Sequence, residues 1–215
     1  MNDSGADYYA YDKKVENGAH KFNIHTPHGD ILNISFGLPG SHNVENAIAA
    51  TAAALLHGIS MDKIKAALES FKGVKRRFDF QIRNSKLVFI DDYAHHPEEL
   101  SACINSVKEL FPGKKVTGIF QPHLYSRTRD FADGFAKSLS LLDELILLDI
   151  YPARELPIPG ITSQMLLDKA TVKNKTLLQK NELVNFIKSK QPEVLLTLGA
   201  GDIDMLVEPL RSALI

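Results

Sequence analysis

The stretch that decides the fold reads Lys86-Leu-Val-Phe-Ile-Asp-Asp-Tyr-Ala-His-His-Pro-Glu-Glu-Leu100. Its apolar run Leu87–Ile90 is rich in branched and aromatic residues, which predicts a buried strand. Pro97 opens a predicted amphipathic helix, because proline suits the first helical turn and one face of the following segment is apolar. Polar side chains fill the connection between the two: Asp91, Asp92, Tyr93, His95 and His96.

This connection is a candidate functional site. Ligands of open α/β sheets bind just past the carboxyl ends of strands, and acids and imidazoles are costly to bury without partners. An ordinary turn before a proline-started helix is the plain structural alternative. A metal-dependent hydrolase is another, since carboxylate and imidazole groups are common metal ligands. Its ligands would come from Asp91, Asp92, His95, His96 and His123.

Beyond Phe78, predicted strands and helices alternate to the end of the chain. The predicted strands are Phe78–Ile82, Leu87–Ile90, Lys115–Phe120, Glu144–Ile150, Thr176–Leu178 and Val194–Leu198. The predicted helices are the one from Pro97, Arg129–Leu141, Ser163–Lys169, Glu182–Lys188 and Ile203–Leu210. This alternation predicts an α/β fold, with a mostly parallel sheet covered by helices on both faces.

Two predicted strands and two predicted helices precede this region. Phe22–Thr26 and Ile31–Phe36 alternate around a Pro-His-Gly-Asp turn, which predicts a hairpin. The alanine-rich run Ala47–Leu56 predicts a helix, and Ser60 caps a second one. His42 and Asn43 would lie near the first helix start, where polar ligands and simple asparagine capping are both open readings. Gly73 and the following basic cluster suggest a boundary, with domains at 1–73 and 74–215.

Three further polar segments follow predicted strands: Gln121–Asp130, Asp149–Glu155 and Gly199–Asp202. The segment from Gln121 to Asp130 carries His123, Arg127 and Arg129, and arginine suits carboxylate or phosphate in bidentate geometry. A parallel sheet would bring this segment to the same edge as Asp91 and its neighbours. The loop Gly199-Ala-Gly-Asp202 permits close backbone approach to an anion, which is a weak indication.

Bulk composition excludes several classes of protein. The 215 residues carry a formal net charge of −1, which gives no electrostatic case for nucleic acid or an anionic membrane surface. The single cysteine, Cys103, lies on the apolar face of its predicted helix, so we expect a core thiol. No apolar run approaches a membrane-spanning length and no signal peptide is evident, so we expect a cytoplasmic protein.

A series of motifs in a fixed order resembles the Mur ligase family. These are Gly40-Ser-His-Asn-Val-Glu-Asn-Ala47, Lys75-Arg-Arg-Phe78, Asp91-Asp-Tyr-Ala-His-His-Pro97, Gln121-Pro-His123 with Thr128-Arg-Asp130, Pro157-Ile-Pro-Gly-Ile-Thr-Ser163 and Gly199-Ala-Gly-Asp202. The resemblance covers essentially the whole chain. It implies a three-domain enzyme with a UDP-sugar domain, a central ATPase domain and a C-terminal Rossmann-like domain.

The resemblance also implies how much of such an enzyme is present. Residues 1–73 would be the end of the central ATP-binding domain, and 74–215 the C-terminal domain. The phosphate-loop pattern Gly-x-x-x-x-Gly-Lys-Ser/Thr does not occur in the sequence. We therefore expect a fragment that is inactive alone, or that behaves as a non-catalytic binding module.

The implied reaction joins L-alanine to UDP-N-acetylmuramate in peptidoglycan precursor synthesis. ATP, with Mg²⁺, would activate the carboxylate as an acyl phosphate, which the amine of alanine then attacks. Catalysis would rest on positioning and charge neutralisation. No metal ligand is assigned to this chain, and the oligomeric state is left open.

The resemblance assigns roles to individual residues. Those placed near the nucleotide are His42, Asn43 and Asn46 at the adenine, Arg77 at the phosphates, and Asp91 or Asp92. Those lining the amino-acid pocket are Tyr93, His95, His123 and Arg127, of which His95 and Arg127 are the catalytic pair. Arg127 would clamp the alanine carboxylate. Many members have arginine where this chain has Leu124, so a second carboxylate contact there is left open.

Overall fold

The computed structural model describes residues 5–16, 19–38 and 40–215. The chain forms two compact units. One takes in the described residues up to Gly73 together with Glu109–Phe111, and the other takes in Val74–Lys108 and Pro112–Ile215. Among the residues described, no helix is both long and apolar enough to cross a membrane.

The first unit is a three-stranded antiparallel sheet with two helices. Its strands are β1 (Tyr9–Glu16), β2 (Ala19–His25) and β3 (Ile31–Phe36), and its helices are α1 (Ser41–Leu56) and α2 (Met61–Ser70). Ile34 and Phe36 pack with Val44 and Ile64 in its core. The predicted hairpin is confirmed. Strand β1 was not predicted from the sequence, because its apolar and polar residues do not alternate regularly and a register shift interrupts its pairing between Tyr11 and Lys14.

Helix α1 begins six residues before the predicted start. Gly40, with φ 92° and ψ 134°, turns the chain into the helix at Ser41. Val44 and Ala47 are buried on its inner face. Packing of this face therefore extends the helix over residues whose intrinsic helix propensity is low.

The second unit contains a six-stranded sheet in the order β4-β5-β9-β6-β7-β8. Its strands are β4 (Asp79–Arg83), β5 (Val88–Asp92), β6 (Val116–Phe120), β7 (Glu144–Leu147), β8 (Asn174–Leu177) and β9 (Val194–Leu198). All neighbours pair in parallel except β4, which is antiparallel to β5. The predicted mostly parallel sheet is thus confirmed.

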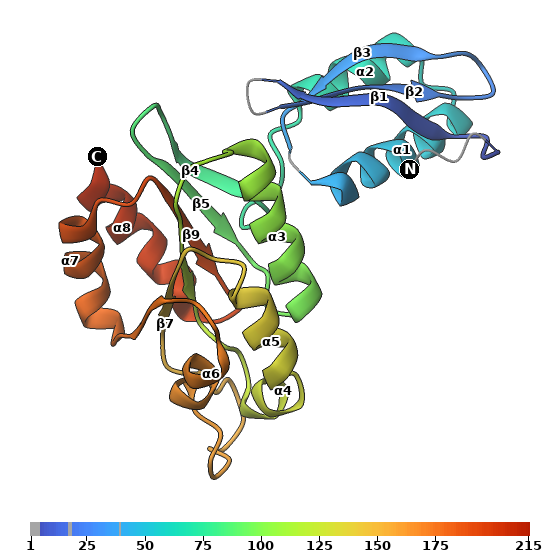
Figure 1. Ribbon diagram of the computed structural model, residues 1–215. Helices are drawn as coiled ribbons and strands as arrows, with labels where there is room; N and C mark the ends of the chain where they lie inside the picture. The colour runs from blue at the N-terminus through green and yellow to red at the C-terminus, as the bar shows by residue number, and fades with distance from the viewer. Residues whose placement is uncertain (1–4, 17–18, 39) are drawn as a thin grey trace. The chain divides into compact units, whose positions relative to one another are not determined.

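Helices cover both faces of this sheet (Figure 1). On one face lie α7 (Lys180–Lys190), the 3₁₀ helix η1 (Asp202–Leu206) and α8 (Val207–Leu214), whose Leu183, Ile187 and Leu210 pack against Phe89 and Ile119. The other face is covered by α3 (Pro97–Leu110), α4 (Tyr125–Asp130), α5 (Ala132–Leu139) and α6 (Ser163–Lys169). Cys103 is buried on α3, as expected of a core thiol.

Several predicted elements were wrong in their bounds. The predicted strand Glu144–Ile150 ends at Leu147, and the predicted helix Ile203–Leu210 is the 3₁₀ helix η1 followed by α8. The segment expected as one helix from Arg129 to Leu141 is two helices that meet at Phe131. Helix α4 starts at Tyr125, so most of the segment read as an arginine-rich loop is helical. Its N-cap residue, Leu124, has no capping side chain. The usual sequence signal for a helix start was therefore missing.

Candidate functional site

The carboxyl ends of β5 and β6 lie at one edge of the second unit, with β9 between them. The segments that follow these strands carry His95 and His123, whose ring centroids are 6.4 Å apart. The structure therefore brings together the two polar segments that the sequence analysis placed at one sheet edge.

Asp91 and Asp92 are the last residues of β5, and both carboxylates are engaged within the protein. Asp91 is 2% exposed and accepts hydrogen bonds from Thr197 Oγ1 (2.7 Å) and Arg76 Nε (3.1 Å). Asp92 accepts from the backbone N–H groups of Phe78 (2.7 Å) and Ala94 (2.8 Å). Burial raises the pKa of both carboxyls, that of Asp92 to about 6. The two carboxylates together hold the Arg76–Phe78 segment against the end of β5.

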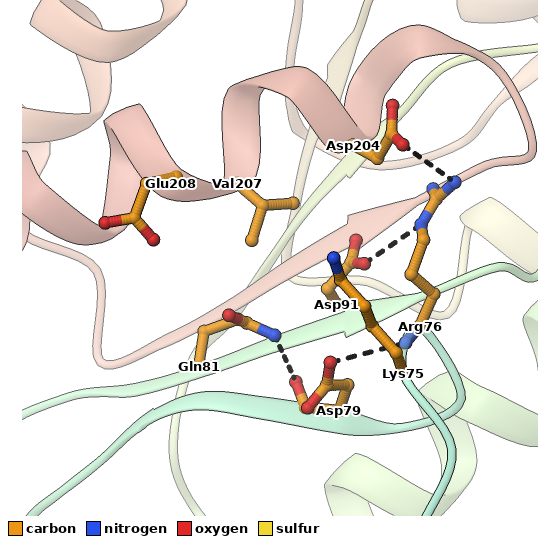
Figure 2. A pocket seen from close by; sticks show the side chains of 8 residues that line it. All are labelled: Lys75, Arg76, Asp79, Gln81, Asp91, Asp204, Val207 and Glu208. Atoms are coloured by element: carbon orange, nitrogen blue, oxygen red, sulfur yellow. Dashed lines mark hydrogen bonds and ion pairs between the residues drawn. The ribbon is translucent and has the colours of Figure 1, made fainter.

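The two arginines of the basic cluster have different surroundings. The Arg76 guanidinium donates to Asp91 and to the Gly199 carbonyl (2.6 Å), and lies 3.8 Å from Asp204; Figure 2 shows its side chain between the two carboxylates. Arg77 is exposed, with its guanidinium carbon 5.9 Å from the centre of the Tyr93 ring. A cavity of about 300 Å³ lies beside Arg76, lined by Lys75, Arg76, Asp79, Gln81, Asp91, Asp204, Val207 and Glu208. The sequence analysis did not identify Arg76 as an internal anchor.

His95 is held in an orientation that suits proton transfer. Its Nδ1 lies 2.9 Å from the Tyr93 carbonyl oxygen. A carbonyl only accepts, so Nδ1 carries a hydrogen, and the Glu99 carboxylate lies 3.3 Å from the same Nδ1. Nε2 is therefore the nitrogen through which this ring can take up or release a proton. Glu99 accepts from the backbone N–H groups of His95 (2.9 Å) and His96 (3.2 Å), which fixes the turn into α3. Glu99 was missed, although its place two residues after Pro97 is typical of a capping carboxylate.

Arg127 and His123 form the other half of the site. The His123 ring stacks on Tyr151 with centroids 5.6 Å apart, and its Nδ1 lies 3.5 Å from Arg127 Nη1. Burial lowers the pKa of His123, and the charges of Arg127 and His95 lower it further. Among the residues that the structure describes, no acidic side chain forms an ion pair with Arg127. A guanidinium without a counter-charge beside a neutral imidazole suits a carboxylate ligand.

The metal-site alternative is not favoured by this arrangement. The His96 ring packs against Phe131, with centroids 4.6 Å apart, while both aspartates bond within the protein. In the ranges that the structure describes, no group of three or more His, Cys, Asp or Glu side chains is placed to hold a metal ion.

The Gly199–Asp202 loop packs against its own chain. A Cβ on Gly201 would lie 2.5 Å from Gln121 Oε1 and 2.8 Å from Tyr151 Cβ. The buried Gln121 amide donates to Asp202 (2.9 Å) and accepts from the Ile203 N–H (2.9 Å). The absence of a side chain at Gly201 therefore allows close packing against Gln121 and Tyr151, and the approach of an anion to this loop stays a prediction.

His42, Asn43 and Asn46 lie in the first unit, on the first two turns of α1. His42 and Asn46 are exposed, and Asn43 is half-buried. The start of α1 is held by the buried His20, whose Nε2 accepts from the Gly40 N–H (3.0 Å). His20 was missed, since a histidine within a hairpin strand carries no distinctive pattern. The adenine-binding role of the three α1 residues stays a prediction.

Comparisons with known proteins agree with this geometry. The family model described as Mur ligase, glutamate ligase domain, matches residues 76–201. A Flavobacterium psychrophilum protein named UDP-N-acetylmuramate–L-alanine ligase is 54% identical over 207 residues, which cover 96% of this chain and 46% of that protein. A Porphyromonas gingivalis protein of the same name is 50% identical, covering 99% of this chain and 47% of that one.

A solved structure agrees as well. The crystal structure of UDP-N-acetylmuramate-alanine ligase from Thermotoga maritima superposes with a TM-score of 0.80 at 28% identity, covering 96% of this chain and 45% of that one. This chain spans about half the length of the curated relatives that it matches. The family model covers more than half of the chain, and both the fold and the motif order agree with it. The chain belongs to the Mur ligase family.

Proposed function

We propose that this chain provides the amino-acid-binding part of an ATP-dependent ligase that joins L-alanine to UDP-N-acetylmuramate. One observation carries the proposal: the Arg127 guanidinium has no acidic partner among the residues described and lies 3.5 Å from His123, at the edge that also holds His95. The names of relatives more than half identical support the choice of substrates. Residues 1–73 would be the end of the central ATP-binding domain, and 74–215 the C-terminal domain.

The residues at the sheet edge have complementary roles in this proposal. Arg127 binds the alanine carboxylate, while His123 and Tyr93 line the pocket around the small side chain. His95 Nε2, with its lone pair outward-facing because Nδ1 bonds the Tyr93 carbonyl, accepts the proton that the amine loses on attack. Holding the amine and its base in fixed geometry is the chief contribution of such a site.

The proposal also assigns residues of this chain to nucleotide binding. ATP supplies the phosphate that activates the UDP-N-acetylmuramate carboxylate, with the exposed Arg77 at the phosphates and His42, Asn43 and Asn46 at the adenine. Asp91 or Asp92 serves the nucleotide, in part by fixing the backbone that carries Arg77. The described residues offer no three-ligand metal group, so no step is assigned to Mg²⁺. The reaction belongs in the cytoplasm, where ATP and nucleotide-linked sugars are available.

A chimera tests the proposal. This chain replaces the matching part of the Flavobacterium psychrophilum relative, and product formation is followed by mass spectrometry and ADP release. We expect alanine-dependent amide formation within about tenfold of the parent, since the substituted region is 54% identical, and no product from the chain alone. A folded chimera that prefers another amino acid over alanine would show that the substrate assignment is wrong.

A further inference from the structure

Helix α4, which carries Arg127, begins without a capping side chain of its own. Its N-cap residue is Leu124, whose backbone has φ 72° and ψ 135°, a conformation unfavourable for a side chain with a Cβ. The first intrahelical bond runs from the Thr128 N–H to the Leu124 carbonyl (3.1 Å). The N–H groups of Tyr125, Ser126 and Arg127 therefore have no partner within the helix.

A carboxylate from another loop takes the place of the missing cap. Glu155 accepts hydrogen bonds from the Ser126 backbone N–H (2.9 Å) and from the Ser126 hydroxyl. These bonds, together with one from the Tyr125 backbone, hold the pKa of Glu155 below its usual range. The group is thus ionised at neutral pH, and a negative charge at a helix N-terminus is favourable.

The loop that presents Glu155 is fastened to the segment before α4. The Tyr151 N–H donates to the Pro122 carbonyl (2.8 Å), and the Leu124 N–H donates to the Tyr151 carbonyl (2.9 Å). The Glu155 N–H closes the turn on the Pro152 carbonyl (2.9 Å). His123 stacks on Tyr151 within the same connection. One short loop therefore sets the start of α4 and the ring of His123 together.

We propose that Glu155 is the positioning residue that holds α4, and with it Arg127, against His123 for binding of the amino-acid carboxylate. Glu155 does not touch the substrate in this scheme and acts through Arg127. The inference rests on the proposed function for the identity of the ligand. The placement of Arg127 itself can be measured without any ligase activity.

The first test uses the chain itself with the variants Glu155→Ala, Glu155→Gln and Glu182→Gln. Glu182 is a matched control, because it caps a different helix, accepting from the Gln179 N–H (3.0 Å) at the start of α7. We expect Glu155→Ala to speed amide exchange of Thr128 and Phe131, whose N–H groups donate to the Leu124 and Arg127 carbonyls, about tenfold, the size of a lost helix cap. Exchange in α3 should not change, and Glu182→Gln should leave α4 as in the wild type.

The ring titration of His123, followed by NMR, separates positioning from simple charge removal. The charged or titratable groups that face His123 are Arg127, His95, Glu155 and the stacked Tyr151. Loss of the Glu155 charge alone lowers the pKa of His123. Movement of the Arg127 guanidinium away from His123 raises this pKa, and by a larger amount. We expect a rise in Glu155→Ala and a fall in Glu155→Gln, whose amide oxygen still accepts from Ser126. A fall in both variants, with wild-type exchange in α4, would overturn the proposal.

The same chimera tests the role of Glu155 in catalysis. Glu155→Ala should raise the KM for alanine about tenfold and leave kcat and the KM for ATP within about threefold, with Glu155→Gln intermediate. Equal losses for all substrates would assign Glu155 a general structural role. If Glu155→Ala does not fold, Glu155→Gln and Ser126→Ala give the same comparison. An inactive wild-type chimera would count against the proposed function only, because exchange and His123 titration still decide the role of Glu155.

Discussion

Arg76 and Arg127 lie at the same edge of one sheet and have opposite electrostatic surroundings. Arg76 is paired with a carboxylate that is 2% exposed and donates to a backbone carbonyl at 2.6 Å. Within the described part of the chain, the partner of the Arg127 guanidinium is the imidazole of His123 at 3.5 Å, and no acidic side chain forms an ion pair with it. The Arg76 guanidinium forms its hydrogen bonds within the protein, whereas the Arg127 guanidinium still has N–H donors that can bind a ligand. The position of the acidic residues, more than the arginine itself, decides which one can bind a ligand.

The largest effect on stability should come from breaking the Arg76–Asp91 ion pair. Arg76→Ala leaves Asp91 as a buried charge without its partner, which costs about 3 to 5 kcal/mol of unfolding free energy. Arg77→Ala is the control, because its side chain is exposed and should cost about 0.5 kcal/mol or less. Urea unfolding followed by circular dichroism measures both. Equal losses in the two variants would mean that the Arg76–Asp91 pair does not anchor the segment.

Removing the other arginine should affect binding while stability changes little. Arg127→Ala should reduce the specificity constant of the chimera for alanine roughly ten- to a hundredfold, the value of a charge-assisted contact of about 1.5–3 kcal/mol. Arg127→Lys should recover part of it, since an ammonium lacks the planar fork. Arg129→Ala removes the same charge from an exposed position on the same helix and should have little effect. A comparable loss for ATP would instead indicate a role in folding or closure.

The last effect is a pH dependence that arises from the carboxylates holding the Arg76–Phe78 segment. Burial raises the pKa of Asp92 to about 6, so the folded state binds this proton more tightly than the unfolded state does. The stability contribution of Asp92 is therefore greatest below about pH 4 and is lost as pH rises through 6. Carbon-13 NMR of the carboxyl carbon should give a midpoint near 6. A midpoint near 4 would mean that the hydrogen bonds from Phe78 and Ala94 outweigh burial.

Many strands and helices of the second unit could be predicted because short sequence patterns mark them. The apolar run Val194–Leu198 and the segment Ser163–Lys169 were predicted with the bounds that the structure has. Short apolar runs and polar helix starts report burial and capping within a few residues. The strand β1 was missed because its polar residues Asp12–Lys14 interrupt the alternation, at the same place where a register shift interrupts the pairing.

The placement of candidate site residues was only partly predictable. A parallel sheet puts the ends of β5 and β6 at one edge, so the approach of His95 to His123 followed from the alternation of elements alone. The helix that carries Arg127 could not be predicted in this way, because the side chain that caps it is Glu155, which lies 29 residues after Ser126. The packing role of Gly201 depends likewise on Gln121 and Tyr151, which are distant in sequence.

The sequence by itself determined the α/β architecture, the sheet edge that carries the polar residues and the family resemblance, since each depends on periodicity, composition or motif order along the chain. Only the tertiary structure decided that Arg76 is internal and Arg77 exposed, although the two are adjacent and chemically identical. Arg76 bonds to Gly199, 123 residues away, while its partner Asp91 bonds to Thr197, 106 residues away. An arginine becomes an anchor or a ligand-binding group through the charges that folding brings beside it, and those charges come from distant parts of the chain.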